Sequence, residues 1–156
     1  HKDKFINVGV AEQNMTMIAA GLALEGHKVY TYSIGNFPTL RCIEHIRNDI
    51  CYHGLDVTIL SVGAGFSYGQ LGVTHFATED IAMMRALPEM SIFSPSDPWQ
   101  IDYMMPNLEK LKSPKYIRID KSIGGSAKNI ELKDLSSYRD REGKDCVIFA
   151  TGGIVS

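Results

Sequence analysis

Short apolar runs alternate with longer segments of helical period along most of this 156-residue chain. The runs are rich in β-branched and aromatic residues, and apolar residues recur three or four positions apart in the segments between them. Strands are predicted at 28–32, 57–62, 90–94 and 115–119, and helices at about 39–50, 78–87 and 98–111. This alternation predicts an α/β fold with a mainly parallel sheet and helices on both faces.

The start of the chain adds one more strand-to-helix transition. Phe5 to Val8 predict the end of a short buried strand, Gly9 a turn, and an apolar period up to Glu25 predicts a helix. Glu12 then falls in the first turn of that helix, at an edge where open α/β sheets bind ligands. A carboxylate there also stabilises the helix dipole by a few tenths to about 1 kcal/mol, so a purely structural role stays open.

Composition bounds the function without naming it. The chain is 44% apolar, which suits one ordinary core, and its net charge of −2 gives no basic surface for nucleic acid. No apolar run reaches the roughly 18–20 residues of a membrane span, and we expect a cytoplasmic protein. Cys42, Cys51 and Cys146 have no metal-binding spacing and are predicted to be buried thiols in a reducing compartment.

Five motifs share their order and spacing with one enzyme family. They are Phe5-Ile-Asn-Val-Gly-Val-Ala-Glu-Gln-Asn14, Arg47-Asn-Asp-Ile50, Gly72-Val-Thr-His75, Glu79-Asp-Ile-Ala-Met-Met-Arg-Ala-Leu-Pro88 and Ser94-Pro-Ser-Asp-Pro98. Over roughly residues 4–121 the chain resembles the pyrimidine-binding domain of the transketolase family of thiamine diphosphate enzymes, and the C-terminal subunit of split transketolases in particular.

The resemblance implies roles for residues around the cofactor. Glu12 would share a proton with a ring nitrogen of the aminopyrimidine, and Phe37 would stack on that ring. Ile34 stands where relatives place a second aromatic residue and cannot stack. Arg41 matches an arginine of the deoxyxylulose-phosphate synthase branch and is predicted beside the cofactor. From the residues alone, Phe37 could equally cover the core and Arg41 could be a solvated helix charge.

The resemblance also implies substrate contacts. His75 would contact substrate hydroxyls near the reacting carbon. Leu71 stands where relatives carry an aspartate that recognises a donor hydroxyl, so an ordinary ketose-phosphate donor is in doubt. Arg118 and Lys121 fall where relatives place basic residues, the second often gripping phosphate. Lys121 lacks the bidentate fork of arginine, and an exposed strand-end lysine is the alternative.

The family's diphosphate and metal motif, Gly-Asp-Gly followed by an asparagine, is absent from the 156 residues. The resemblance therefore implies that Mg²⁺ or Ca²⁺ and the cofactor's diphosphate bind a partner domain or subunit, in a homodimer or heterotetramer, and that this segment binds no metal itself. The implied reaction is transfer of a two-carbon ketol unit from a ketose or 2-keto donor to an aldehyde. The alternatives are a β-type subunit of a 2-keto-acid dehydrogenase, a deoxyxylulose-phosphate synthase-like enzyme, and a non-catalytic partner domain.

Three segments are predicted along the chain, and both ends look truncated. Residues 1–121 form the pyrimidine-binding domain, incomplete at its N-terminus. Residues 122–144, rich in Gly, Ser, Lys and Asp, form a linker. Residues 145–156 begin a C-terminal transketolase-type domain, with its first strand at 145–150.

Overall fold

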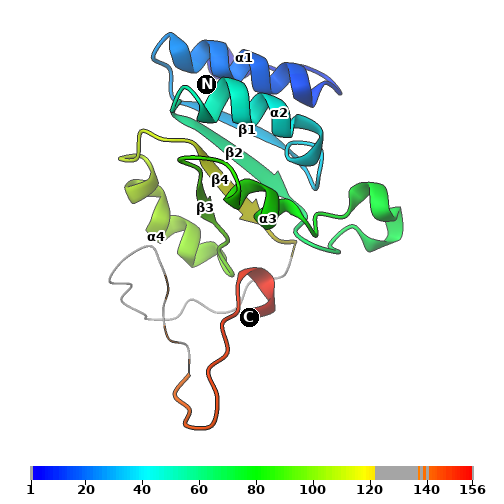
Figure 1. The fold of residues 1–156 in the computed structure, drawn as a ribbon, viewed down its shortest axis with the longest axis vertical. Coiled ribbons are helices and arrows are strands. Elements are labelled where there is room, and N and C mark those ends of the chain that lie inside the picture. The colour runs from blue at the N-terminus through cyan, green and yellow to red at the C-terminus, as the bar shows by residue number, and fades with distance from the viewer. Residues whose placement is uncertain (1, 122–136, 138, 140, 156) are drawn as a thin grey trace.

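A four-stranded, fully parallel sheet forms the centre of the molecule (Figure 1). The computed structural model describes residues 2–121, 137, 139 and 141–155. The strands are β1 (Val29–Ile34), β2 (Val57–Val62), β3 (Ser91–Phe93) and β4 (Lys115–Ile119), in the order β1-β2-β4-β3. Each neighbouring pair is parallel, which confirms the predicted α/β class.

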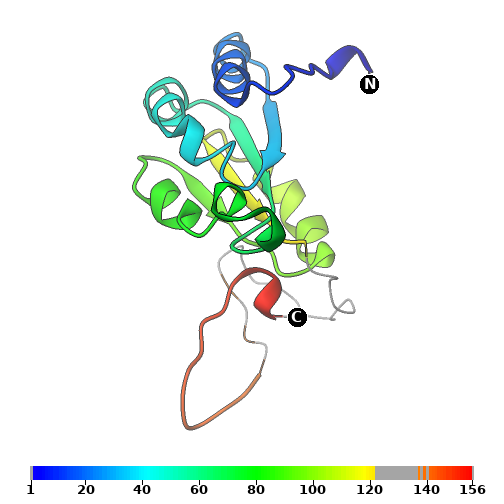
Figure 2. The ribbon, with the colours of Figure 1, turned by 90° about the vertical axis from the view of Figure 1, so that its right-hand side faces the viewer.

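Helices connect the strands and cover both faces of the sheet. The longer ones are α1 (Glu12–Leu24), α3 (Asp80–Arg85) and α4 (Pro98–Leu108). The helix predicted at 39–50 forms as three consecutive segments: η2 (Leu40–Cys42), α2 (Ile43–His45) and the π-helical η3 (Ile46–Cys51). Seen edge-on, α4 lies on one side of the sheet, and α2 and α3 lie on the other (Figure 2). Within the described residues, no helix combines the length and apolarity needed to cross a membrane.

The sheet has a core on each face because successive strand residues point in opposite directions. On β4, Tyr116 packs into a core that α1, η3 and α3 complete, with Ile46 and Met84 fully buried in it. The next residue, Ile117, packs into a second core with Met104 and other apolar residues of α4.

The predicted strand end at Phe5 to Val8 is wrong. No strand forms there, and Phe5 and Ile6 are 73% and 59% exposed. The Asn7 side chain accepts a hydrogen bond of 2.9 Å from the backbone N–H of Gly9, which folds the chain into a local turn. A strand is stabilised by pairing with a neighbour, and these residues have no neighbouring strand in the described part of the chain.

The strand predicted at 145–150 is wrong as well. These residues are exposed and belong to no strand, with Phe149 at 93% exposure. The short 3₁₀ segment η6 (Gly152–Val155) follows, and the N–H of Gly152 donates to the Ser94 carbonyl at 3.3 Å. Most of the predicted linker, 122–144, lies outside the described residues, so the division into two domains stays a prediction.

Candidate active site

The loop that follows β1 forms hydrogen bonds to the carboxyl end of β2. The N–H of Gly35 donates to the Val62 carbonyl at 2.7 Å, and the Gly35 carbonyl accepts from Ser61 Oγ at 2.8 Å. Gly35 has φ of 53°, and a Cβ at this position would lie 2.8 Å from the His75 carbonyl oxygen. Glycine therefore lets the backbone of His75 approach the end of β1.

Glu12 lies at this edge with its carboxylate almost completely covered. The residue is 8% exposed and begins α1. Its Oε1 accepts a hydrogen bond from Ser33 Oγ at 3.1 Å, and its Oε2 accepts one from Arg41 Nη1 at 2.9 Å. Burial raises the pKa of Glu12, but hydrogen bonds from its own backbone, Ser33 and Arg41, together with the Arg41 charge, outweigh burial and lower that pKa overall. Glu12 is therefore an ionised carboxylate at neutral pH.

An aromatic ring and an imidazole continue the arrangement away from Glu12. The guanidinium carbon of Arg41 lies 4.5 Å above the centre of the Phe37 ring. The Phe37 and His75 ring centres are 5.2 Å apart, with an interplanar angle of 69°. Thr74 Oγ1 and His75 Nδ1 lie within hydrogen-bond distance at 3.0 Å. The predicted residues Glu12, Phe37, Arg41 and His75 thus come together.

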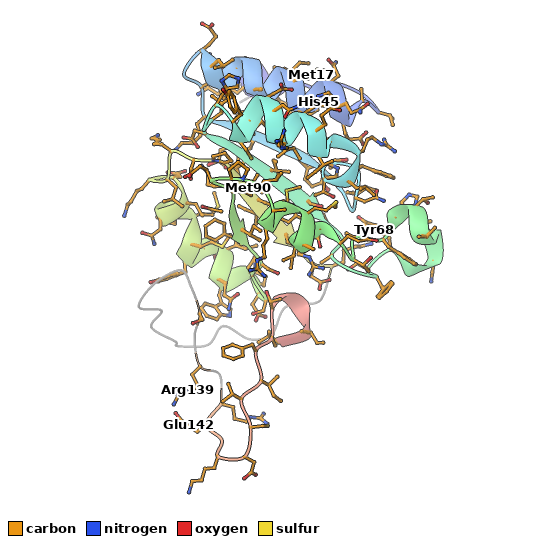
Figure 3. The ribbon with its side chains drawn as sticks, viewed as in Figure 1. Met17, His45, Tyr68, Met90, Arg139 and Glu142 are labelled. Carbon is orange, nitrogen blue, oxygen red and sulfur yellow. The ribbon has the colours of Figure 1, made fainter. Side chains whose placement is uncertain are left out.

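The segment that carries His75, which we call the 65–77 loop, projects past the end of β2 (Figures 1 and 3). Two backbone hydrogen bonds of 3.0 and 2.9 Å between Gly65 and Ala77 close its base. Tyr68 lies near this base (Figure 3), and its ring centre is 6.4 Å from that of His75. Lys121 Nζ lies 4.3 Å from the centre of the Tyr68 ring, so this predicted phosphate ligand lies near the His75 side of the site.

The other predicted residues lie differently. Leu71 is 55% exposed in η4 (Gly69–Leu71) of the 65–77 loop, and Ile34 is partly buried at the end of β1. Arg118 donates through Nε to the buried Asp80 at 2.8 Å and through Nη2 to the Ala77 carbonyl at 3.3 Å. These contacts favour a structural role for Arg118, and its predicted contact with substrate phosphate stays a prediction.

Two neighbours of the site were missing from the predicted set. Ser33 donates to Glu12, and Tyr68 lies near both His75 and Lys121. Ser33 could have been predicted from the sequence, because it directly follows the strand predicted at 28–32 and ligands of parallel sheets bind at the carboxyl ends of the strands. No sequence signal distinguished Tyr68 from other loop aromatics.

The described residues hold no group of three or more His, Cys, Asp or Glu side chains that could bind a metal ion. The site offers an ionised acceptor, Glu12, which Arg41 connects to the ring of Phe37 and the imidazole of His75 beyond it. Such a set suits a planar nitrogen heterocycle that donates a hydrogen bond and stacks.

Comparison with known proteins identifies the family. The family model described as "Transketolase, pyrimidine binding domain" matches residues 1–125. The chain is 36% identical over 118 residues to a subunit of the apulose-4-phosphate transketolase of Actinobacillus succinogenes, covering 76% of this chain and 38% of that protein. It is 33% identical over 153 residues to a 6-deoxy-6-sulfo-D-fructose transketolase subunit of a Clostridium species, covering 97% of this chain and 48% of that protein.

A solved structure agrees with the sequence relatives. A split-gene transketolase, described as an inactive β4 tetramer, superimposes with a TM-score of 0.69 at 34% identity and covers 87% of this chain and 43% of that one. The chain thus spans less than half the length of these relatives. Since the family model matches four-fifths of its length, the chain belongs to the transketolase family as a pyrimidine-binding domain.

Proposed function

We propose that this domain supplies the pyrimidine-binding half of a thiamine diphosphate site in a transketolase-like transferase. The reaction moves a two-carbon ketol unit from a ketose or 2-keto donor to an aldehyde acceptor. The observation that carries this proposal is the buried, ionised Glu12 carboxylate at the carboxyl edge of the sheet, which Arg41 links to the Phe37 ring and, through that ring, to His75.

The residues present fit an aminopyrimidine ring. Glu12 already accepts a hydrogen bond from a planar, delocalised cation, the Arg41 guanidinium, and that cation already lies over Phe37. A protonated aminopyrimidine has the same two properties, a flat π-system and an N–H donor. The same carboxylate and the same ring therefore suit it chemically.

When bound, thiamine diphosphate supplies a carbanion nucleophile and afterwards an electron sink. Glu12 holds a proton at the ring nitrogen, and Ser33 fixes the carboxylate through Oε1. Phe37 orients the ring by stacking. His75 binds substrate hydroxyls, and Lys121, next to the Tyr68 ring, attracts a phosphate group as a point charge.

The second half of the site is proposed to come from a partner. The relatives named above are subunits, and the diphosphate motif Gly-Asp-Gly is absent from this sequence. We propose that a partner domain or subunit binds the diphosphate through Mg²⁺ or Ca²⁺, in a dimer or heterotetramer. The cytoplasmic location stays a prediction.

The test is Glu12→Gln in the complete enzyme with its partner. Glutamine keeps the shape of the side chain but cannot hold the proton, so turnover at saturating cofactor should fall about 10²–10⁴-fold. The matched control is Glu25→Gln, an exposed residue directly after the same helix, which should keep wild-type turnover. Activity of Glu12→Gln within a few-fold of wild type would show that Glu12 is not the proton-holding group.

The substrate pair separates the alternatives. Ketol transfer predicts turnover of a ketose phosphate with an aldehyde acceptor. A β-type dehydrogenase subunit predicts turnover of a 2-keto acid with a lipoyl partner and none with sugars, and a deoxyxylulose-phosphate synthase-like enzyme predicts that a 2-keto acid donor is decarboxylated before transfer to an aldehyde phosphate.

A further inference from the structure

The side chain of Arg41 makes both of the contacts that the proposed function assigns to the cofactor's pyrimidine ring. Its Nη1 donates to Glu12 Oε2 at 2.9 Å, and its guanidinium carbon lies 4.5 Å from the centre of the Phe37 ring. Guanidinium is planar, carries N–H donors in its plane and stacks on aromatic faces. Arg41 therefore imitates a protonated aminopyrimidine at the two groups that would bind it.

Two flat groups cannot stack on the same face of Phe37 at once. The other oxygen of Glu12 already accepts from Ser33. Stacking of a ring on the face of Phe37 that Arg41 covers therefore requires the guanidinium to leave.

The environment of Arg41 allows that movement. Its side chain is 44% exposed, whereas Glu12 beneath it has a side chain only 10% exposed. The Arg41 backbone is held separately, since its carbonyl accepts a hydrogen bond of 3.3 Å from Gln13 Nε2. The guanidinium can thus rotate into solvent while the helical segment stays in place.

Arg118 provides the contrast. It also pairs with a buried carboxylate, but its side chain is 14% exposed and it donates to Ala77 as well as to Asp80. Such a multiply bonded arginine is part of the framework. Arg41 has one polar side-chain contact and one stacking contact among the described residues, and both are contacts of the proposed cofactor site.

We infer that Arg41 occupies the pyrimidine position in the cofactor-free protein and must be displaced when thiamine diphosphate binds. This inference rests on the proposed function. Arg41 is then a competitor of the cofactor rather than one of its ligands, and it keeps Glu12 charge-compensated while the site is empty.

The experiment compares Arg41→Met with wild type in the complete complex. Calorimetry with thiamine diphosphate and Mg²⁺ gives the dissociation constant, and stopped-flow fluorescence gives the association rate. Losing a half-exposed ion pair and a cation–π contact should tighten binding by roughly three- to thirtyfold and speed association. Arg47→Met, an exposed arginine on η3, controls for the loss of one positive charge and should bind as wild type does.

The outcomes separate the two proposals. No binding of thiamine diphosphate by wild type would overturn the proposed function and this inference with it. Binding by wild type that is equalled or weakened in a folded Arg41→Met variant would overturn this inference alone, since Arg41 would then be neutral or a cofactor ligand. Thermal unfolding of each complex verifies that the variants are folded.

Discussion

Asp80→Asn removes a buried charge while keeping the shape of the side chain, and we expect it to destabilise the fold substantially. Asp80 is 1% exposed, and its Oδ2 accepts hydrogen bonds from Tyr116 Oη at 2.6 Å and Arg118 Nε at 2.8 Å. Burial and the Asp80 charge both raise the pKa of Tyr116 above its usual range, so the phenol stays protonated and donates. The pair ties the first turn of α3 to β4, and Arg118 extends it to the base of the 65–77 loop.

The expected loss of stability follows from the Arg118 charge that Asp80→Asn leaves without a carboxylate partner. Breaking a buried ion pair from one side costs about 3–5 kcal/mol, because the remaining charge is uncompensated. The Arg118 side chain is 14% exposed, which lets water screen part of its charge, and the amide oxygen of Asn can still accept hydrogen bonds from Tyr116 and Arg118. We therefore expect a loss of about 2–4 kcal/mol in the free energy of unfolding, or a fall in melting temperature of roughly 4–16 °C.

Urea unfolding followed by circular dichroism measures this loss on the complete protein. Asp102→Asn, an exposed aspartate on α4, is the matched control and should change stability by less than about 0.5 kcal/mol. In a double-mutant cycle with Arg118→Met, the second substitution should cost much less once Asp80 is Asn. An Asp80→Asn protein as stable as the control, or strictly additive losses, would refute the reasoning.

Two further predictions concern the site itself. Leu71→Asp should raise kcat/KM on a ketose phosphate by about tenfold or more in the complete enzyme, because a charge-assisted hydrogen bond contributes roughly 1.5–3 kcal/mol; no gain would mean that Leu71 does not set the donor. The lowered pKa of Glu12 means that its ionised form stabilises the fold at pH values above its ordinary pKa of 4.5 and that this contribution disappears as pH falls through the lowered value. The stability difference between wild type and Glu12→Gln should therefore shrink on acidification from pH 6 to pH 3, and a difference that is constant with pH would contradict the ion pair.

Local patterns in the sequence were sufficient to predict the sheet and the position of Glu12. The runs at 57–62 and 115–119 are apolar enough to indicate buried parallel strands, and both formed within a residue of the prediction. The start of α1 at Glu12 is equally local, since the helical period sets it. Local patterns failed at 5–8 and 145–150, where β-forming residues have no neighbouring strand in the described chain, because a strand depends on partners that its own sequence does not contain.

The assembly of the site, in contrast, follows from packing between elements. The ion pair between Glu12 and Arg41 crosses 29 positions in the sequence, and the hydrogen bond from Ser33 to Glu12 crosses 21. The sequence places these groups on a helix start, a strand end and a loop, but their distances follow from how α1 packs on β1 and η2. The same holds for Arg118: its place on β4 was predictable, whereas its pairing with Asp80 required α3 to fold back over the sheet. The period of apolar residues determines which face of a helix or strand a residue occupies. Only the packing of helices against strands determines which oppositely charged side chain it pairs with.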